Sequence, residues 1–173
     1  MKWRGFTLVE LLVTLAIGTI LLAIAIPGYA FLANAGRLTA VTNDLVTTLH
    51  FARSEAIKRG IRVTVCKTSN AVALPPTCDA TASWQQGWLV FADGGMRGVI
   101  DPGDILLWVH DSAHTTVDIT SYNYDRYISY LPSGGSRGSS GLANGTIRIC
   151  VTDSRRDIII NITGRPRLGS GTC

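Results

Sequence analysis

Apolar and polar positions divide the chain into two parts with different periodicity. The first part, Phe6–Ile26, has 21 residues that are almost all apolar. As an α-helix it would be ~31 Å long, which matches the thickness of a bilayer core. The exception is Glu10, and an ionisable side chain inside a membrane segment is costly enough to be a candidate functional residue. The pattern therefore predicts a membrane-spanning helix with one functional carboxylate.

Beyond Pro27 the apolar residues recur every three or four positions, which is the spacing of one helix face. This stripe consists of Leu38, Val41, Leu45, Leu49, Ala52 and Ala56. Lys58 and Arg59, followed by Gly60, form a C-terminal helix signal. We expect one continuous helix over Phe6–Arg59, in which Pro27 can introduce a kink.

The rest of the chain, 61–173, has the pattern of short strands separated by turns. Ile61–Cys66 alternates apolar with polar residues, which predicts a half-buried strand. Further strands are expected at Gly87–Ala92, Ile105–His110, Thr116–Ser121, Tyr127–Leu131, Thr146–Val151 and Asp157–Thr163. The glycine- and serine-rich stretch Leu131–Gly145 is expected to be a mobile loop. Strands at this spacing indicate antiparallel sheets, so the fold class is α+β. A membrane segment (6–27) and an amphipathic segment (28–60) would form one long helix packed on a β domain.

Charge is distributed unevenly along the chain, although the total is only +4. Residues 126–173 carry seven arginines against two aspartates, which gives that quarter a net charge of +5. Such asymmetry indicates an anionic partner, either nucleic acid or anionic lipid. The alternative is a solvated basic face that only keeps the protein soluble.

The four cysteines have no CxxC spacing, which argues against a zinc site. Three disulfide pairings are possible. We expect Cys66–Cys78 and Cys150–Cys173, because each pair closes a local loop. The second bond would enclose the arginine-rich C-terminal stretch.

No group of residues forms a recognisable catalytic motif. The stretch Asp93–Asp104 carries aspartates at 93, 101 and 104. A calcium loop needs oxygen ligands at alternating early positions. Two of the early ligand positions hold Gly95 and Arg97, and an arginine cation opposes a metal. We therefore expect a hairpin turn there, and a protein that is not an enzyme and uses no metal or cofactor.

The stretch RGFTLVELL, Arg4–Leu12, resembles the class III leader of type IV pilins and pseudopilins. The resemblance implies that a prepilin peptidase removes residues 1–5 by cutting between Gly5 and Phe6, and methylates the new N-terminus. Glu10 would then pair with the N-terminal ammonium of a neighbouring pilin, which lowers the cost of both buried charges. The implied location is the bacterial inner membrane, with the β domain in the periplasm, and later the pilus at the cell surface.

Three further stretches resemble the FimT and GspH branch of minor pilins and pseudopilins. They are FARSEAIKRGIRVTVC (51–66), WQQGWLVFAD (84–93) and GRPR (164–167). In FimT minor pilins a C-terminal GRxR stretch contacts DNA during natural transformation. The resemblance therefore implies a minor pilin whose partners are DNA, other pilins, the prepilin peptidase and, before assembly, membrane lipid.

The residue types in GRPR suit a phosphate backbone. Arg165 and Arg167 are two positions apart, so an extended chain points both in the same direction, ~6.6 Å apart. That separation is close to the spacing of adjacent phosphates, and a guanidinium can bind two phosphate oxygens. Pro166 stiffens the backbone, while Gly164, Gly169 and Gly171 would let a polymer approach closely.

Four other arginines are secondary candidates for DNA contact: Arg155 and Arg156 at an expected hairpin tip, Arg137 and Arg97. Alternatives remain open at this point. Arg165 and Arg167 could pair with Asp153, with Asp157 or with a neighbouring subunit. The chain could be a structural H-type pseudopilin of type II secretion, a priming pilin without a ligand, or an adhesin for an anionic surface polymer.

Overall fold

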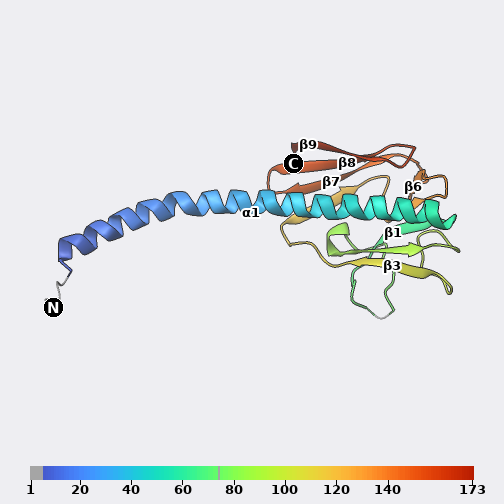
Figure 1. Cartoon of the computed structure of the whole chain (residues 1–173), viewed down its shortest axis with the longest axis horizontal. Helices are drawn as coiled ribbons and strands as arrows, with labels where there is room; N and C mark the ends of the chain where they lie inside the picture. Colours follow the sequence, from blue (N-terminus) through green and yellow to red (C-terminus); the bar gives the residue numbers. More distant parts are fainter. Residues whose placement is uncertain (1–5, 74) are drawn as a thin grey trace. The chain divides into compact units, whose positions relative to one another are not determined.

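The computed structural model describes residues 6–73 and 75–173, so Gly5 of the expected leader lies outside the described residues. The chain forms two compact units that meet between Gly36 and Arg37. Helix α1, Leu8–Arg59, runs through this boundary as one continuous element (Figure 1). The helix expected over Phe6–Arg59 is therefore confirmed, with a start two residues later.

In the N-terminal unit, the helix presents its apolar side chains on all sides. The backbone amide of Glu10 donates a hydrogen bond to the Thr7 hydroxyl, a short polar side chain that caps the first turn. The helix is long and apolar enough to cross a membrane, and its most apolar window is not buried by the described protein. A helix that is hydrophobic all round needs lipid or other protein as its surroundings.

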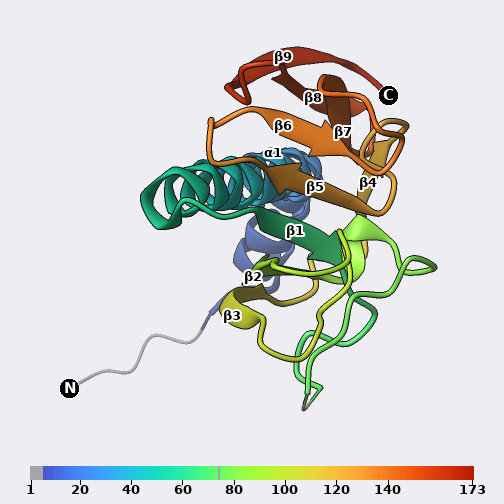
Figure 2. The ribbon, with the colours of Figure 1, turned by 90° about the vertical axis from the view of Figure 1, so that its right-hand side faces the viewer.

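The second unit combines the C-terminal half of α1 with two antiparallel sheets (Figures 1 and 2). The five-stranded sheet has the order β3-β2-β1-β5-β6. Its strands are β1 (Val63–Lys67), β2 (Trp88–Ala92), β3 (Ile105–His110), β5 (Tyr127–Tyr130) and β6 (Ser136–Gly138). The four-stranded sheet has the order β4-β7-β8-β9. Its strands are β4 (Val117–Ser121), β7 (Gly145–Val151), β8 (Ser154–Ile160) and β9 (Pro166–Thr172). A short 3-10 helix, η1 (Trp84–Gln86), precedes β2.

The apolar stripe of α1 packs against both sheets in one core. All six stripe residues are buried there, together with side chains from both sheets. The four-stranded sheet contributes Val117, Ile119, Ile147, Ile149, Val151, Ile158 and Ile160. Because side chains alternate along a strand, the residues between these point to the opposite, solvent-facing side, called the outer face below.

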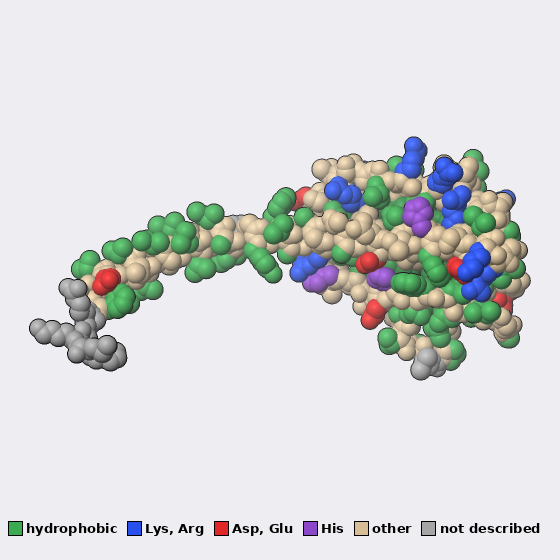
Figure 3. All heavy atoms as spheres, in the orientation of Figure 1, with side chains coloured by type: hydrophobic (Ala, Val, Ile, Leu, Met, Phe, Trp, Pro, Cys, Tyr) green, Lys and Arg blue, Asp and Glu red, His purple; other side chains and the backbone are tan. Residues whose placement is uncertain are grey.

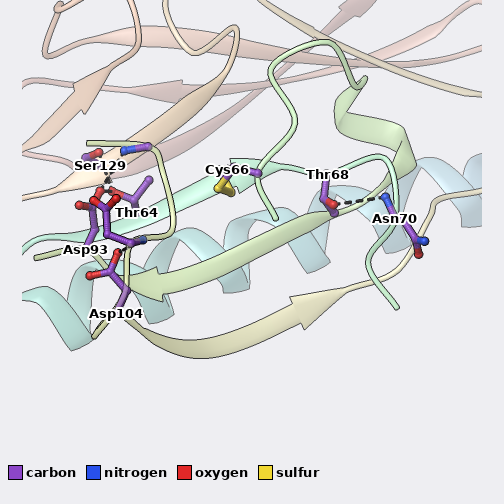
Figure 4. The surroundings of a disulfide bond; sticks show 10 residues. Thr64, Cys66, Thr68, Asn70, Asp93, Asp104 and Ser129 are labelled. Atoms are coloured by element: carbon purple, nitrogen blue, oxygen red, sulfur yellow. Dashed lines mark hydrogen bonds between the residues drawn. A yellow bond between two sulfur atoms is a disulfide. The ribbon is translucent and has the colours of Figure 1, made fainter. Parts of the chain in front are cut away.

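Strand β1 is buried along its whole length, so the prediction of a half-buried strand was wrong. The reason is that β1 is a central strand with α1 on one side and the loops before and after β2 on the other. Its polar side chain Thr64 is satisfied internally: the hydroxyl donates to Asp93 at 2.6 Å and lies 2.7 Å from Ser129 (Figure 4). Arg62 pairs with the same carboxylate, and this hydrogen bond raises the pKa of Arg62.

Two strands were missed by the sequence analysis. The expected mobile loop Leu131–Gly145 contains β6, whose residues pair with β5. The C-terminal stretch is not a free tail but strand β9, paired with β8 over seven residues. Both strands contain glycine and serine, which have low intrinsic preference for strands, so only pairing with a neighbour decides their conformation.

Shortening one stripe residue should destabilise the whole β domain. Leu49 is fully buried in the core. We expect Leu49→Ala to cost about 2–5 kcal/mol of unfolding free energy, through lost burial and a residual cavity. The measurement is urea unfolding followed by tryptophan fluorescence. Leu142→Ala is the matched control: this side chain is 51% exposed, so its loss should change stability by less than about 0.5 kcal/mol.

Candidate nucleic-acid interface

The β8–β9 hairpin carries the arginines that the sequence singled out. In its register Ile159 lies opposite Arg167 and Ile160 opposite Pro166. Proline is tolerated at this position because β9 is an edge strand and Pro166 is its first residue. The extended conformation expected for this stretch is therefore present, but it is imposed by a neighbouring strand.

The turn between β8 and β9 is organised by Asn161. Its side-chain oxygen accepts hydrogen bonds from the Arg165 amide at 3.0 Å and from the Thr163 hydroxyl at 2.8 Å. Its backbone oxygen accepts from the Gly164 amide at 2.8 Å. These bonds hold the backbone of Arg165 in place just before β9 begins.

Gly164 is buried and has a positive φ of 75°, a conformation that favours glycine. A Cβ here would lie 2.1 Å from the carbonyl oxygen of Gly134 and 3.0 Å from the ring of Tyr130. The expectation that Gly164 lets a polymer approach was wrong, because protein atoms already occupy that space. Its role is to let the β8–β9 turn pack against the β5–β6 turn of the other sheet.

Both arginines of the GRPR stretch are exposed. Neither guanidinium forms an ion pair or a hydrogen bond with any residue that the structure describes. Asp157, one of the partners considered above, instead pairs with Arg155, with Nε and Oδ1 3.2 Å apart. The Asn161 turn and edge strand β9 hold the backbone of these two arginines, and their guanidinium groups can therefore bind an anion from solvent. In Figure 3 basic side chains gather at the upper side of the globular part, where β8 and β9 lie in Figure 1.

The outer face of the four-stranded sheet continues this basic surface. Alternation along the paired strands places Arg148, Arg155 and Arg167 on it, on three adjacent strands. Two glycines of β9, Gly169 and Gly171, leave the edge of this face without side chains, and the guanidinium of Arg155 extends over Gly171. The result is an exposed sheet face that carries these three arginines together with the carboxylates of Asp118 and Asp157.

The secondary candidates are less well grouped than their sequence positions indicated. Arg155 and Arg156 are in β8 and not at a hairpin tip, because β8 begins at Ser154 and the turn is formed by residues 152–153. Alternation directs Arg156 to the opposite face from Arg155. Arg137 is exposed in β6, and Arg97 lies in the connection between β2 and β3.

The disulfides join Cys66 to Cys78 and Cys150 to Cys173, the pairing expected from the sequence. The second bond lies where β7 turns into β8, next to the hydrogen bond from the Cys173 amide to the Asp153 carbonyl. Strand β9 is therefore held at both ends, by the Asn161 turn at its start and by a covalent bond at its finish.

The aspartates of the stretch Asp93–Asp104 bind the backbone of their own loop. Asp101 accepts a hydrogen bond from the Met96 amide at 2.6 Å, and Asp104 accepts from the Gly94 amide at 2.9 Å. Asp93 is paired with Arg62 as described above. Within the described residues, no three side chains of His, Cys, Asp or Glu come together as metal ligands. This connection between β2 and β3 is a hydrogen-bonded structural loop.

Comparison with known families agrees with this architecture. Residues 4–26 match the prokaryotic N-terminal methylation motif, and residues 41–164 match the family described as type II transport protein GspH. This chain belongs to the GspH family. It is thus a member of the minor type IV pilins and pseudopilins, as the resemblance in its sequence implied. The matched range includes most of the β domain and ends at Gly164, just before the two candidate arginines.

Solved structures show the same fold as this GspH-family chain. Two crystal forms of the type IV minor pilin FimU from Pseudomonas aeruginosa match it with TM-scores of 0.57 and 0.55. Their sequence identities are 19% and 20%; the matches cover 78% and 76% of this chain, and 89% and 92% of the FimU chains. No curated protein matches the sequence. The fold class predicted from the sequence, a long helix on antiparallel sheets, is confirmed.

Removing the C-terminal disulfide should loosen β9 selectively. With Cys150 and Cys173 both replaced by serine, we expect faster amide hydrogen exchange in residues 166–172, because one end of the edge strand loses its anchor. Exchange in the second half of α1 should change little. Mass-spectrometric hydrogen exchange measures both regions in one experiment, and equal acceleration throughout the domain would contradict the assignment.

Proposed function

We propose that this GspH-family chain is a minor type IV pilin of the FimT kind, which binds DNA through Arg165 and Arg167 for uptake in natural transformation. The observation that carries the proposal is the pair of exposed guanidinium groups without ion-pair partners among the described residues. Their backbone is ordered by the Asn161 turn, so binding an anion would require little further ordering of the chain.

Phosphate is the part of DNA that these groups suit. An arginine fork can bind two oxygens of a phosphate, and phosphate contacts do not depend on base identity. The binding we propose is therefore independent of sequence. Arg148 and Arg155, on the same sheet face, would add to the positive field, although Arg155 is partly neutralised by Asp157.

Assembly follows from the same family membership. We propose that a prepilin peptidase cuts between Gly5 and Phe6, and that the apolar half of α1 holds the chain in the inner membrane before it joins neighbouring pilins. A structural role as the H-type pseudopilin of type II secretion is the second candidate, because the family that matches is described as type II transport protein. DNA binding separates the two candidates.

Removing both candidate arginines should weaken DNA binding and its salt dependence together. For Arg165→Ala with Arg167→Ala, we expect the slope of log affinity against log salt to fall by about 1.8 for duplex DNA, at roughly 0.9 for each phosphate contact. The measurement is a titration of fluorescent duplex with the full chain in non-ionic detergent at several salt concentrations. Lysine at both positions should restore part of the affinity, since charge returns without the fork.

The control removes the same two charges elsewhere. Lys58 and Arg126 are both exposed, on the last turn of α1 and beside the five-stranded sheet, and neither lies on the four-stranded sheet. Their double alanine variant should keep most of the wild-type salt slope. If the two double variants behave alike, binding depends on net charge only, and the structural pseudopilin becomes the better candidate.

Glu10 offers a test of assembly that is independent of DNA. We expect Glu10→Ala to insert into membranes as well as wild type, because an intramembrane charge is removed. Incorporation into pili should fall, since the terminal ammonium of a neighbour would lose its partner. Immunoblots of membrane and sheared-pilus fractions measure both quantities, and normal incorporation would argue against the pairing.

A further inference from the structure

A polar hollow opens on the four-stranded sheet at the end where β4 finishes and β7 begins. It has a volume of about 580 Å³. Its lining consists of Thr120, Ser121, Tyr122, Asn123, Asn144, Gly145, Thr146 and Arg148. The hollow is separate from the GRPR turn, and none of its residues is a candidate site residue from the sequence.

Tyr122 gives the hollow an aromatic wall. Its side chain is 89% exposed, more than that of any other large hydrophobic residue in the described chain. Tyr122 directly follows Ser121, the last residue of β4, and lines the hollow together with Thr146 of β7. An aromatic ring left this exposed next to a concave polar surface is available for stacking with a planar group.

The floor of the hollow is fixed by hydrogen bonds and by one glycine. The side-chain Nδ2 of Asn123 donates to the Asn144 carbonyl at 2.6 Å, and the Ser121 hydroxyl donates to the Thr146 carbonyl at 2.8 Å. A Cβ at Gly145 would lie 2.7 Å from the ring of Tyr124 and 2.9 Å from Asn123. Glycine therefore lets the two segments approach closely, and the hollow is formed before any ligand arrives.

The charge of the lining favours an anion. None of the eight lining residues has a carboxylate. Arg148 is exposed and forms no ion pair with a described residue, because Asp157, opposite it on β8, pairs with Arg155. The lining thus combines one cation for a phosphate, an aromatic face for a planar ring, and amide and hydroxyl groups for polar ring edges. A nucleotide carries all three complementary groups, whereas a neutral sugar would leave the arginine without a counter-ion.

We propose that this hollow binds an unpaired nucleotide of single-stranded DNA, with its base against Tyr122 and its phosphate on Arg148. The inference rests on the DNA binding proposed above and adds strand selectivity to it. In a duplex the bases are stacked and paired inside, so a duplex can use the arginines but not the tyrosine ring.

The sheet register connects the hollow to the GRPR site. Thr146 pairs with Ile159, and Ile159 pairs with Arg167, so these residues form one row across the sheet. With neighbouring strands ~4.8 Å apart, Thr146 and Arg167 at the two ends of the row are ~10 Å apart, and Tyr122 lies beyond Thr146, directly after β4. Ile159 lies between them on the outer face and is 37% exposed, which offers an apolar contact to a base. A single strand of a few nucleotides can therefore contact both ends.

The experiment compares single-stranded and duplex DNA on the full chain in non-ionic detergent. The probes are a fluorescent oligothymidine and a mixed-sequence duplex of equal length. Tyr122→Ala should weaken binding of the oligothymidine at least about five-fold, the lower end of a base-stacking contribution, and leave duplex binding unchanged. Tyr122→Phe keeps the ring and should stay within about two-fold of wild type. Arg148→Gln should lower the salt slope for the oligothymidine by about 0.7.

Comparing the Tyr122→Ala and Arg165/Arg167 variants distinguishes failure of this inference from failure of the proposed function. If Tyr122→Ala binds the oligothymidine like wild type while the Arg165/Arg167 variant loses the duplex, the hollow is not a nucleotide site and the GRPR proposal stands. If wild type binds neither probe, both fail. Tyr122-dependent binding of a neutral oligosaccharide such as maltoheptaose, without Tyr122-dependent binding of the oligothymidine, would also overturn the inference. Unchanged thermal unfolding of Tyr122→Ala, expected for so exposed a residue, shows that the variant is folded.

Discussion

Burial of the apolar stripe of α1 is the interaction on which the β domain depends. The two sheets share no strand pairing among the described strands, so backbone hydrogen bonds do not hold them together. Leu45, Leu49, Ala52 and Ala56 are completely buried between side chains of both sheets. The two alanines let the strands come close to the helix, and the two leucines fill the space between the sheets. Because one helix serves both sheets, a change in its stripe affects every other element of this unit.

The candidate DNA site depends on this packing through a second contact. The β8–β9 turn belongs to the four-stranded sheet, and the β5–β6 turn follows a strand of the five-stranded sheet. Gly164 and Gly134 bring the two turns into direct contact, in a space too small for a Cβ. Burial of the Tyr130 ring beneath Gly164 raises the pKa of its hydroxyl, as expected for a group withdrawn from water. The position of Arg165 and Arg167 is therefore set by contacts between the sheets.

Charge on the outer face is arranged unevenly. Asp157 neutralises Arg155, whereas Arg148, Arg165 and Arg167 have no ion-pair partner in the described part of the chain. Exposed ion pairs contribute little to the free energy of unfolding, so leaving these arginines unpaired destabilises the fold only slightly. Unpaired cations over small side chains are better suited to an extended anion than to internal stabilisation. This arrangement supports the proposal that the face binds nucleic acid.

Local patterns in the sequence were sufficient for the helix, for most strands and for the family. The apolar run from Phe6 and the stripe spacing predicted α1 to within two residues of its start, and the strand expected at Ile105–His110 has the observed bounds of β3. These features depend on residues close together in the chain, and periodicity reports them directly. The cysteine spacing likewise indicated the two disulfides, because each closes a short loop.

Other features required the tertiary structure, since they depend on residues far apart in the chain. Strands β6 and β9 have weak strand preference and form only because β5 and β8 pair with them. The buried state of β1 follows from its central position in a sheet covered on both faces. The sequence suggested that Gly164 lets a polymer approach closely. Its contact with Gly134 joins two segments that are far apart in the chain, so neither segment alone indicates it. For the same reason, Tyr122 and Arg148 became a candidate site only when strand register placed them around one hollow.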